Sequence, residues 1–408
     1  MKYPRPKIIF LTNMLSGGGA ERSLLDIFKA LDRRRFDPEL WRLKPLNMYS
    51  KLLGASSATR VLPRLPQDSR TKARLKKYQA RLPGYLRCTQ SEDSLEDALR
   101  LFDALRPITQ RKSPSLALVS SQINMNARVS IVQWLFNYQV PVVFIEQNEP
   151  YIKYNFTESG MKRDRAWAII SRTYPRASQV VAISAAARQS LISQFGINAK
   201  QVSSIPNPVN LKQLRTSIAA RRPQHPFFNG RVPVLVCVAR FHPVKNHAML
   251  LRSFALVRKK TPARLILLGH GPLKESILRV VTEMQLSRDV AVIDFDPDPF
   301  PYLAHADLSV LASYSEGQGM AVVESLACGV PVACTHWKGV DELVQHGVNG
   351  IVCEINDQAL AAGILAGLKL SKSKTAHSAA RLSAERFDVS QIAPLYENLL
   401  VRTLGLLT

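Results

Sequence analysis

The sequence predicts an α/β fold made of two domains, each built around a parallel β-sheet. The chain has 408 residues, which is long for one ordinary domain and close to two of about 200 residues each. Short apolar runs, typical of strands buried on both faces, are separated by segments with helical periodicity. In two places a strand, a glycine-containing loop and a helix follow one another, as an α/β nucleotide site requires.

The first half begins with one of these strand–loop–helix passages. Residues 7–12 form the predicted strand, Gly17, Gly18 and Gly19 form the loop, and residues 20–31 form the helix. The loop suits the close approach of a phosphate, but three glycines also suit a tight turn, and these residues alone favour neither interpretation. The other elements predicted in this half are strands at 116–120, 141–145 and 179–183 and helices at 126–138 and 162–174.

Two prolines that bracket Asn207 predict a stiff, extended crossing between the domains. We therefore place the first domain at residues 1–207, the second at 208–385 and a terminal segment at 386–408. The second half is predicted to contain strands at 234–239, 265–268, 291–295, 308–311 and 329–334, and helices at 320–328, from 338 onwards, at 357–370 and at 390–404.

The most informative segment runs from Glu316 to Glu324. These two glutamates flank Gly317 and Gly319 at the start of an apolar run that predicts a buried helix, with Glu324 on an accessible edge. The glycines allow a ligand to approach the backbone, and a helix N-terminus attracts phosphate. Because carboxylates repel phosphate, they are better suited to hydrogen-bond the hydroxyls of a sugar beside it. A capped loop–helix junction would explain the glutamates alone, but the strands on either side favour a nucleotide-sugar site.

Two cations follow the strand at 234–239. Arg240 comes at its carboxyl end and Lys245 five residues later, in the usual ligand crevice of a parallel sheet. Two fixed positive groups could neutralise a departing nucleoside diphosphate without a metal. The pair alone would suit an ordinary solvated loop, and the segment beginning at Glu316 favours the functional interpretation.

These motifs together resemble glycosyltransferase family 4, a family of retaining enzymes with the GT-B fold. In the first half, Gly17 to Arg22 resembles the loop of bacterial surface-polysaccharide and lipid-linked-oligosaccharide transferases. The resemblance implies two Rossmann-like domains facing a cleft, with a C-terminal helix that packs back on the first domain. It covers most of residues 7–355, strongly from about residue 160 and loosely across the basic insertion described below.

The resemblance also implies a site and a reaction. It assigns catalysis to Glu316, Arg240 and Lys245, and it places the donor on the second domain and the acceptor on the first. The donor-binding residues are Arg240, Lys245, Gly269, Gly317, Gln318, Gly319, Met320 and Glu324, and the first-domain loop residues are Gly17, Gly18, Gly19, Glu146 and Gln147. A sugar would pass from a nucleoside-diphosphate sugar, with UDP favoured, to a glycolipid or polysaccharide precursor by front-face attack, without a metal or other cofactor.

Two departures bear on this interpretation. Gln147 stands where many relatives carry a histidine, and glutamine cannot hold a charge. The turn at Lys338-Gly339 has one glycine where two are usual. The Gln147 departure favours an alternative function, a catalytically impaired GT-B protein that serves as a partner or scaffold in glycan assembly. The intact donor residues argue against it.

The charge of the chain is +24, and it is concentrated in the first domain. Within an insertion at about 42–112, residues 42–87 contain 12 basic residues and one acidic residue, Asp68. Residues 69–82 could form a basic helix with Leu75, Tyr78 and Leu82 on one side, which suits an anionic membrane surface. A solvated insertion explains the charge equally well. No nucleic-acid-binding motif accompanies it, so nucleic acid is not an expected partner.

The remaining features indicate a cytoplasmic protein on the inner face of the membrane. No apolar run approaches the roughly 20 residues of a membrane helix, and the run at 8–11 is too short for a signal peptide. The five cysteines, at positions 88, 237, 328, 334 and 353, show no metal-ligand spacing and are expected to be reduced. The acids at 294, 296 and 298 are followed by prolines, which predicts a loop entering a helix rather than a metal site.

Overall fold

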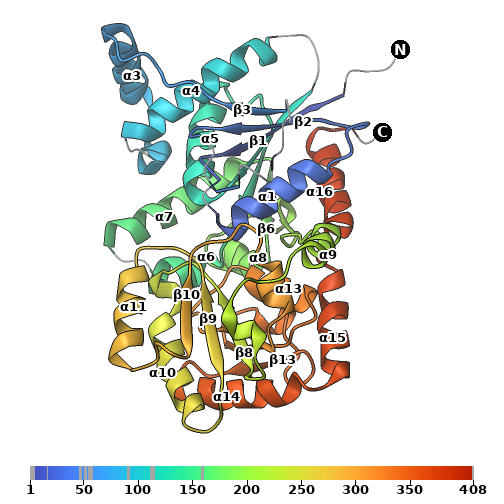
Figure 1. Ribbon diagram of the computed structural model, residues 1–408. Coiled ribbons are helices and arrows are strands. Elements are labelled where there is room, and N and C mark those ends of the chain that lie inside the picture. Colours follow the sequence, from blue (N-terminus) through green and yellow to red (C-terminus); the bar gives the residue numbers. More distant parts are fainter. Residues whose placement is uncertain are drawn as a thin grey trace. The chain divides into compact units, whose positions relative to one another are not determined.

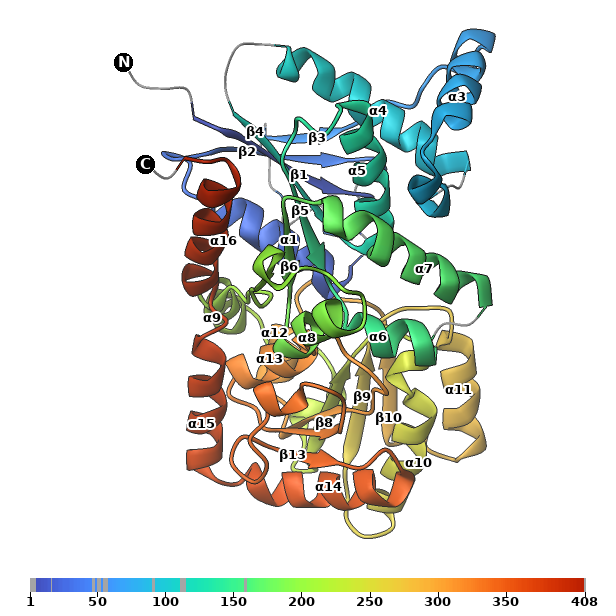
Figure 2. The same cartoon turned by 180° about the vertical axis from the view of Figure 1, so that it is seen from behind.

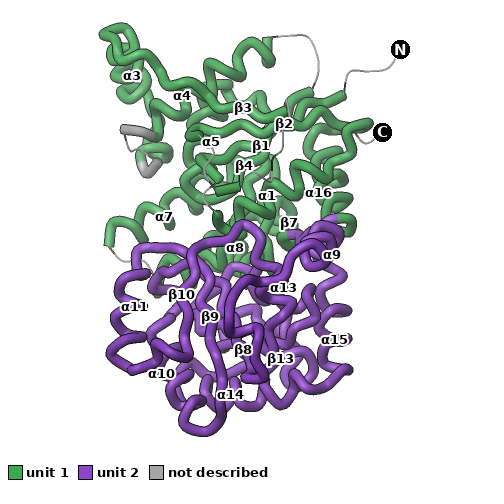
Figure 3. Tube along the Cα trace, in the orientation of Figure 1, with its two compact units in different colours: residues 1–207, 390–408 green, residues 208–389 purple. Residues whose placement is uncertain are grey.

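The computed structural model describes residues 5–406 except 16, 46–47, 50–52, 54–57, 90–91, 111–114 and 158–159. The described chain divides into two compact units (Figure 3). Unit 1 comprises residues 1–207 and 390–408, and unit 2 comprises residues 208–389. Each unit contains one parallel β-sheet covered by helices, so the predicted fold class is confirmed.

The sheet of unit 1 has the strand order β3-β2-β1-β4-β5-β6-β7. Its strands are β1 (Lys7–Thr12), β2 (Asp37–Arg42), β3 (Thr59–Val61), β4 (Leu116–Ser121), β5 (Val142–Glu146), β6 (Gln179–Ala182) and β7 (Val202–Ser204). Its helices are α1 (Gly19–Ala30), α3 (Ser69–Arg81), α4 (Glu92–Thr109), α5 (Ile123–Leu135), α6 (Pro150–Ile152), α7 (Gly160–Thr173), α8 (Ala185–Ser193) and α16 (Val389–Thr403). Helices α1 and α16 lie on one face of this sheet, and α4, α5 and α7 lie on the other (Figures 1 and 2).

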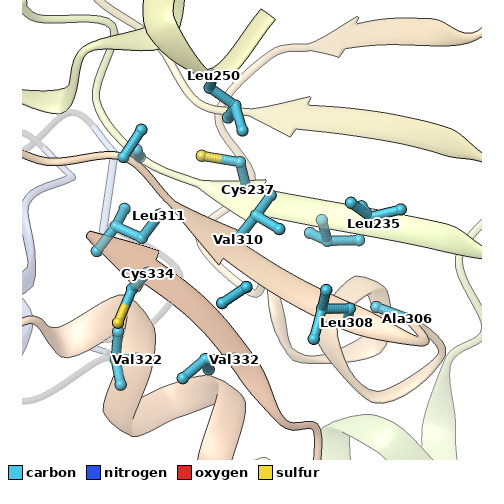
Figure 4. Close-up of a cluster of buried hydrophobic side chains, with 14 of the residues drawn as sticks. Leu235, Cys237, Leu250, Ala306, Leu308, Val310, Leu311, Val322, Val332 and Cys334 are labelled. Atoms are coloured by element: carbon cyan, nitrogen blue, oxygen red, sulfur yellow. The ribbon is translucent and has the colours of Figure 1, made fainter. Parts of the chain in front are cut away.

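The sheet of unit 2 has the strand order β10-β9-β8-β11-β12-β13. Its strands are β8 (Val234–Val238), β9 (Arg264–Leu268), β10 (Val290–Ile293), β11 (Leu308–Leu311), β12 (Val332–Thr335) and β13 (Gly350–Cys353). Its helices are α9 (Leu211–Ala220), α10 (His247–Arg258), α11 (Lys274–Glu283), α12 (Phe300–Ala304), α13 (Met320–Ala327), α14 (Asp357–Leu370) and α15 (Lys374–Glu385). Strands β8, β11 and β12 supply the centre of its core, where Cys237, Val310 and Cys334 are packed among aliphatic side chains (Figure 4).

The strand order of each sheet reverses at one point, and ligands of open α/β sheets bind outside the carboxyl ends of the strands at such a point. In unit 1 the reversal lies between β1 and β4, so the loop with Gly17 to Gly19 borders it. In unit 2 it lies between β8 and β11. The loops after these two strands carry Arg240, Lys245 and Glu316.

Several sequence-based expectations need correction. No long helix begins at Lys338, because only a short 3-10 helix, Val340–Glu342, forms there. The basic helix is present as α3, but its apolar side faces the protein, because Leu82 is buried and Leu75 and Tyr78 pack on the core of unit 1. That side is therefore not available to lipid.

The described cysteine side chains, those of Cys237, Cys328, Cys334 and Cys353, are buried free thiols. The side chain of Cys88 lies outside the described part. Within the described residues, no helix is long and apolar enough to cross a membrane.

Candidate functional site

The candidate donor site lies in unit 2, where β8 and β11 end side by side. Lys245 closes a short 3-10 helix after β8, and Glu316 lies in the loop after β11. The Tyr314 backbone N–H donates to the Val244 carbonyl at 2.9 Å, which ties the two loops together. Lys245 and Glu316, 71 positions apart in the sequence, therefore meet at the sheet edge.

The Lys245 ammonium donates to the Glu316 carboxylate, with 2.5 Å between Nζ and Oε1. The same carboxylate oxygen accepts the Ser313 hydroxyl at 2.6 Å. The Glu316 side chain is only 9% exposed and that of Lys245 21%. The structure thus brings one predicted diphosphate ligand and one predicted sugar ligand into a direct, partly desolvated ion pair.

Arg240 is not part of this ion pair. It is exposed at the carboxyl end of β8, and among the described residues it makes no ion pair or side-chain hydrogen bond. A guanidinium at this edge that has no counter-ion in the described chain is available to an anionic ligand.

Two glycines shape the wall beside Arg240. A Cβ atom at Gly269 would lie 2.0 Å from the Ala239 carbonyl oxygen, and one at Gly271 would lie 2.4 Å from the Phe241 carbonyl oxygen. Gly271 also has a φ of +148°, which side chains other than glycine rarely adopt. The chain after β9 therefore passes directly against the residues on either side of Arg240 and fixes their backbone.

The loop from Gly317 to Gly319 leads into α13, which begins at Met320. Gly319 has a φ of +79°, and a Cβ atom there would lie 3.0 Å from the Trp337 ring. Gly319 is the N-cap of α13, and its carbonyl accepts the Val322 N–H at 2.8 Å. Gln318 is buried beside it. Because the chain turns at Gly319, α13 begins directly after the loop, with its positive N-terminal end at the carboxyl edge of the sheet. Phosphate binding would be favoured at that helix end.

Glu324 differs from its expected place on an accessible edge. It lies in the second turn of α13 and is buried, with 7% of its surface exposed. Helix α13 packs against α12 and α15, which explains this burial.

His247, in the first turn of α10, follows directly after the loop that carries Lys245. It is 2% exposed, its ring packs edge-on against Phe241, and neither ring nitrogen has a hydrogen-bond partner among the residues that the structure describes. Burial, and to a smaller extent the charge of Lys245, lowers the pKa of His247 to about 4. The imidazole is therefore neutral at pH 7.

We expect His247 to make the fold sensitive to acid. Between the ordinary histidine pKa of about 6.5 and about 4, the unfolded chain binds a proton at this position that the folded chain does not, so stability is lost as the pH falls. The contribution is about 3 kcal/mol across this window. His247→Leu should remove this pH-dependent contribution. The native chain should therefore lose about 3 kcal/mol more unfolding free energy than the variant when the pH falls across this window.

Urea unfolding at about pH 7 and about pH 4.5 measures this difference. The matched control is His336→Leu, because His336 is exposed in the same unit. An unchanged pH dependence in His247→Leu would contradict the expectation.

In unit 1 the predicted glycine loop precedes α1. Gly17 has a φ of +95°, and Gly18 is the N-cap of α1. The Glu21 carboxylate accepts the Gly18 N–H at 2.9 Å and the Gln122 amide at 3.3 Å. Part of the positive potential of this helix end is thus already compensated by a side chain of the helix itself.

Glu146 and Gln147, at the end of β5, are both held inside unit 1. Glu146 is fully buried, and its carboxylate accepts the Tyr174 hydroxyl at 2.7 Å and the Asn148 amide at 3.0 Å. Burial raises the pKa of Glu146, an effect that these hydrogen bonds oppose. Gln147 donates to Ser121 at 3.0 Å and accepts from Asn207 at 2.8 Å. These contacts give both side chains a role in fixing the loop.

The acids after β10 are engaged with neighbouring side chains. Asp294 pairs with Lys274, Asp296 pairs with Arg221, and Asp298 accepts the Ser217 hydroxyl. Within the described part of the chain, no group of three or more metal-ligating side chains is present.

Sequence reasoning did not identify Ser313, Trp337 or His247 as residues of this region. Ser313 could have been found from its place at the end of a predicted strand, three residues before Glu316. Trp337 approaches Gly319 through the packing of the loop after β12, and the sequence carries no signal for that contact.

Comparison with protein families gives two matches. Residues 17–213 match the model described as Glycosyltransferase Family 4, and residues 232–369 match the model described as Glycosyl transferases group 1. The two matched regions together include both candidate regions described above.

A relative from Campylobacter jejuni is 28% identical over 277 residues, which is 66% of this chain and 72% of that protein. It is named N-acetylgalactosamine-N,N'-diacetylbacillosaminyl-diphospho-undecaprenol 4-alpha-N-acetylgalactosaminyltransferase. N-acetyl-alpha-D-glucosaminyl L-malate synthase of Bacillus anthracis is 32% identical over 124 residues, 30% of this chain and 32% of that protein.

Solved structures show the same fold. Anabaena HepE in complex with UDP and glucose superposes with a TM-score of 0.76 at 22% identity, covering 96% of this chain and 98% of that chain. Sucrose-phosphate synthase from Thermosynechococcus elongatus gives 0.75 at 18% identity, covering 99% and 100%. With a family 4 domain and a group 1 domain matched and the fold shared, the chain is a glycosyltransferase with two Rossmann-like domains of the GT-B type.

Proposed function

We propose that the chain transfers a sugar from a nucleoside-diphosphate sugar, with a UDP-sugar favoured, to a membrane-associated glycolipid or polysaccharide precursor, with retention at the anomeric carbon. The observation that carries this proposal is the Lys245–Glu316 ion pair at the strand-order reversal of unit 2, near Arg240, which has no counter-ion among the described residues. These are the charges that a diphosphate bonded to a sugar requires.

In this mechanism Arg240 and Lys245 neutralise the charge that develops on the departing diphosphate, and the N-terminus of α13 adds to that potential. Glu316 releases Lys245 to the diphosphate and accepts hydrogen bonds from the sugar hydroxyls. Gly317 and Gly319 leave room for the sugar at the backbone. An oxygen of the leaving diphosphate removes the acceptor proton, so the mechanism needs no protein base.

Two comparisons support the substrate classes. The Anabaena neighbour was crystallised with UDP and glucose and also with UDP-glucose, which favours a uridine nucleotide. The Campylobacter relative acts, by its name, on a diphospho-undecaprenol-linked sugar, which favours a lipid-linked acceptor.

A lipid-linked acceptor would place the enzyme at the inner face of the membrane. Helix α3 presents exposed basic side chains that make no ion pair with described residues, namely Arg70, Lys72, Lys76, Lys77 and Arg81. Its apolar side is packed on unit 1, so the contact would be electrostatic and sensitive to salt. Co-sedimentation with phosphatidylglycerol vesicles but not with phosphatidylcholine vesicles would support this association, and equal sedimentation with both would exclude it.

Nucleotide binding tests the proposed function. We expect one of UDP and GDP to bind saturably in calorimetry with EDTA present, and Arg240→Ala to weaken that binding roughly 10- to 100-fold, because a charge-assisted contact is lost. Arg231→Ala is the matched control, since Arg231 is also exposed in unit 2. Failure of both nucleotides to bind would contradict the transferase proposal.

One observation favours the alternative of a non-catalytic partner in glycan assembly. The polar side chains at the end of β5 bond to other residues of unit 1. Glu146 accepts a hydrogen bond from Tyr174, and Gln147 is hydrogen-bonded to Ser121 and Asn207. Binding of the sugar donor without any turnover in the presence of membrane lipids would favour this alternative.

A further inference from the structure

Arg42, the last residue of β2, carries a buried charge that the described protein does not neutralise. Only 7% of its surface is exposed, and its Nε and Nη1 atoms are buried without a hydrogen-bond partner. Burial lowers the pKa of this guanidinium, but an arginine keeps its proton in a protein. Leaving two of the three guanidinium nitrogens buried without a partner is costly, so a residue of this kind indicates a missing anionic partner.

The described residues around Arg42 offer no such partner. No aspartate or glutamate occurs between Glu39 and Asp68. Two buried acids of unit 1 are already engaged, because Asp97 pairs with Arg100 and Arg128, and the Glu21 carboxylate accepts from Gly18 and Gln122.

Strand register shows where the guanidinium lies. Arg42 pairs with Thr12 of β1, and the side chains of paired residues in a parallel sheet point to the same face. Two residues earlier on β1, Phe10 lies on this face and packs against Phe28 of α1. Arg42 therefore points to the face that α1 covers, at the carboxyl edge, from which the glycine loop leads into the N-terminus of that helix.

A second orphaned polar group lies beside Arg42. Asn13 follows β1 directly, and its Oδ1 atom is buried without a hydrogen-bond partner in the described part of the chain. The Leu43 and Lys44 N–H groups donate to the carbonyls of Thr12 and Asn13, which holds the two strand ends together. A buried cation and a buried amide thus share the sheet edge next to the strand-order reversal of unit 1.

We propose that Arg42 and Asn13 form an anion site in unit 1 that binds a phosphate-bearing group of the acceptor. The planar guanidinium suits phosphate oxygens, and the orphaned Asn13 Oδ1 atom can accept a hydrogen bond from a hydroxyl next to them. The N-terminus of α1 adds a smaller favourable potential, because Glu21 already caps it. The identification of the ligand as the acceptor rests on the proposed function.

Inorganic pyrophosphate is the first probe, and the donor site must be removed so that it does not bind there. In the full chain carrying Arg240→Ala and Lys245→Ala, calorimetry should still detect one pyrophosphate site. Adding Arg42→Gln should weaken it at least about 10-fold. Arg64→Gln, which alters an exposed arginine of the same basic insertion, should leave the affinity unchanged. No binding in the double variant, or equal binding after Arg42→Gln, would overturn the proposal.

Two further measurements complete the test. Arg42→Lys keeps the positive charge and should retain part of the pyrophosphate affinity. It takes the place of Arg42→Gln if the glutamine variant does not fold. Geranyl diphosphate and glucose 6-phosphate separate the sources, because tighter binding of the former assigns the site to a lipid diphosphate and tighter binding of the latter to a phosphorylated sugar.

The stability of the ligand-free chain gives an independent reading. Arg42→Met should raise the unfolding temperature, because it removes an unpaired buried charge while keeping the apolar stem. A lowered unfolding temperature would assign Arg42 to the fold instead. If UDP or GDP binds the native chain but pyrophosphate does not bind the double variant, the anion site fails while the proposed function stands.

Discussion

Replacing Glu316 by glutamine is expected to lower the rate of sugar transfer at least ~100-fold while tightening the binding of the free nucleoside diphosphate. In the ligand-free chain the Glu316 carboxylate accepts a hydrogen bond from the Lys245 ammonium, with 2.5 Å between Nζ and Oε1. The carboxylate therefore competes with a diphosphate for Lys245, and its negative charge would repel the diphosphate. Glutamine removes both effects, so a diphosphate without its sugar should bind roughly three- to tenfold more tightly. The rate falls because the group that orients the sugar hydroxyls loses its charge.

Lys245→Ala should act in the opposite direction on binding and in the same direction on rate. Without the ammonium the diphosphate loses a ligand, and the Glu316 carboxylate, which is only 9% exposed, is left without its counter-ion. Binding of the free nucleoside diphosphate should therefore weaken, and transfer should again fall by two orders of magnitude or more.

The measurement is calorimetry with the nucleoside diphosphate, together with its release from the matching sugar donor under single-turnover conditions. Glu283→Gln is the control for Glu316→Gln, because Glu283 is an exposed glutamate of unit 2. Weaker binding of the free diphosphate by Glu316→Gln would show that the carboxylate does not compete for Lys245.

The sequence predicted the central strands well because their signal is local. Strands β1 and β11 begin and end at the predicted residues, and both are apolar runs buried by their neighbours. Strand β2 was missed because Asp37–Arg42 contains a proline and three charged residues, which is typical of a loop. Its pairing with β1 brings it into the sheet, and tertiary context of this kind leaves no local pattern.

The candidate donor site could be located but not assembled from the sequence. Arg240 and Glu316 were placed at strand ends by their motifs, but the Lys245–Glu316 contact depends on β8 and β11 being neighbours. The burial of Glu146 had no signal either, because a glutamate is usually exposed and its partner Tyr174 lies 28 positions away. The roles of these residues in catalysis stay predictions.

Gly269→Ala is expected to destabilise unit 2 by more than about 3 kcal/mol and to abolish nucleotide binding. Its N–H donates to the Ile293 carbonyl at 3.0 Å, and Phe241 donates to the His270 carbonyl at 2.7 Å, so the chain here is fixed from both sides. An added Cβ atom would lie 2.0 Å from the Ala239 carbonyl oxygen. The closest atoms are backbone atoms of Ala239, and the Phe241 ring at 3.3 Å is buried, so no flexible side chain can move away to relieve the clash.

The main-chain shift that relieves this clash would displace Ala239, the residue directly before Arg240, so stability and donor binding should be lost together. Urea unfolding and nucleotide calorimetry on the same preparation test this link. Gly230→Ala is the control, since the nearest atom to its added Cβ would be 3.9 Å away. If Gly269→Ala and Gly230→Ala have the same unfolding midpoint, the prediction is wrong. The backbone at the strand ends can then shift at a lower energy than its hydrogen bonds indicate. If nucleotide binding is lost but stability is unchanged, Gly269 contacts the donor directly. In that case the added methyl group would occupy space that the ligand needs and the fold does not.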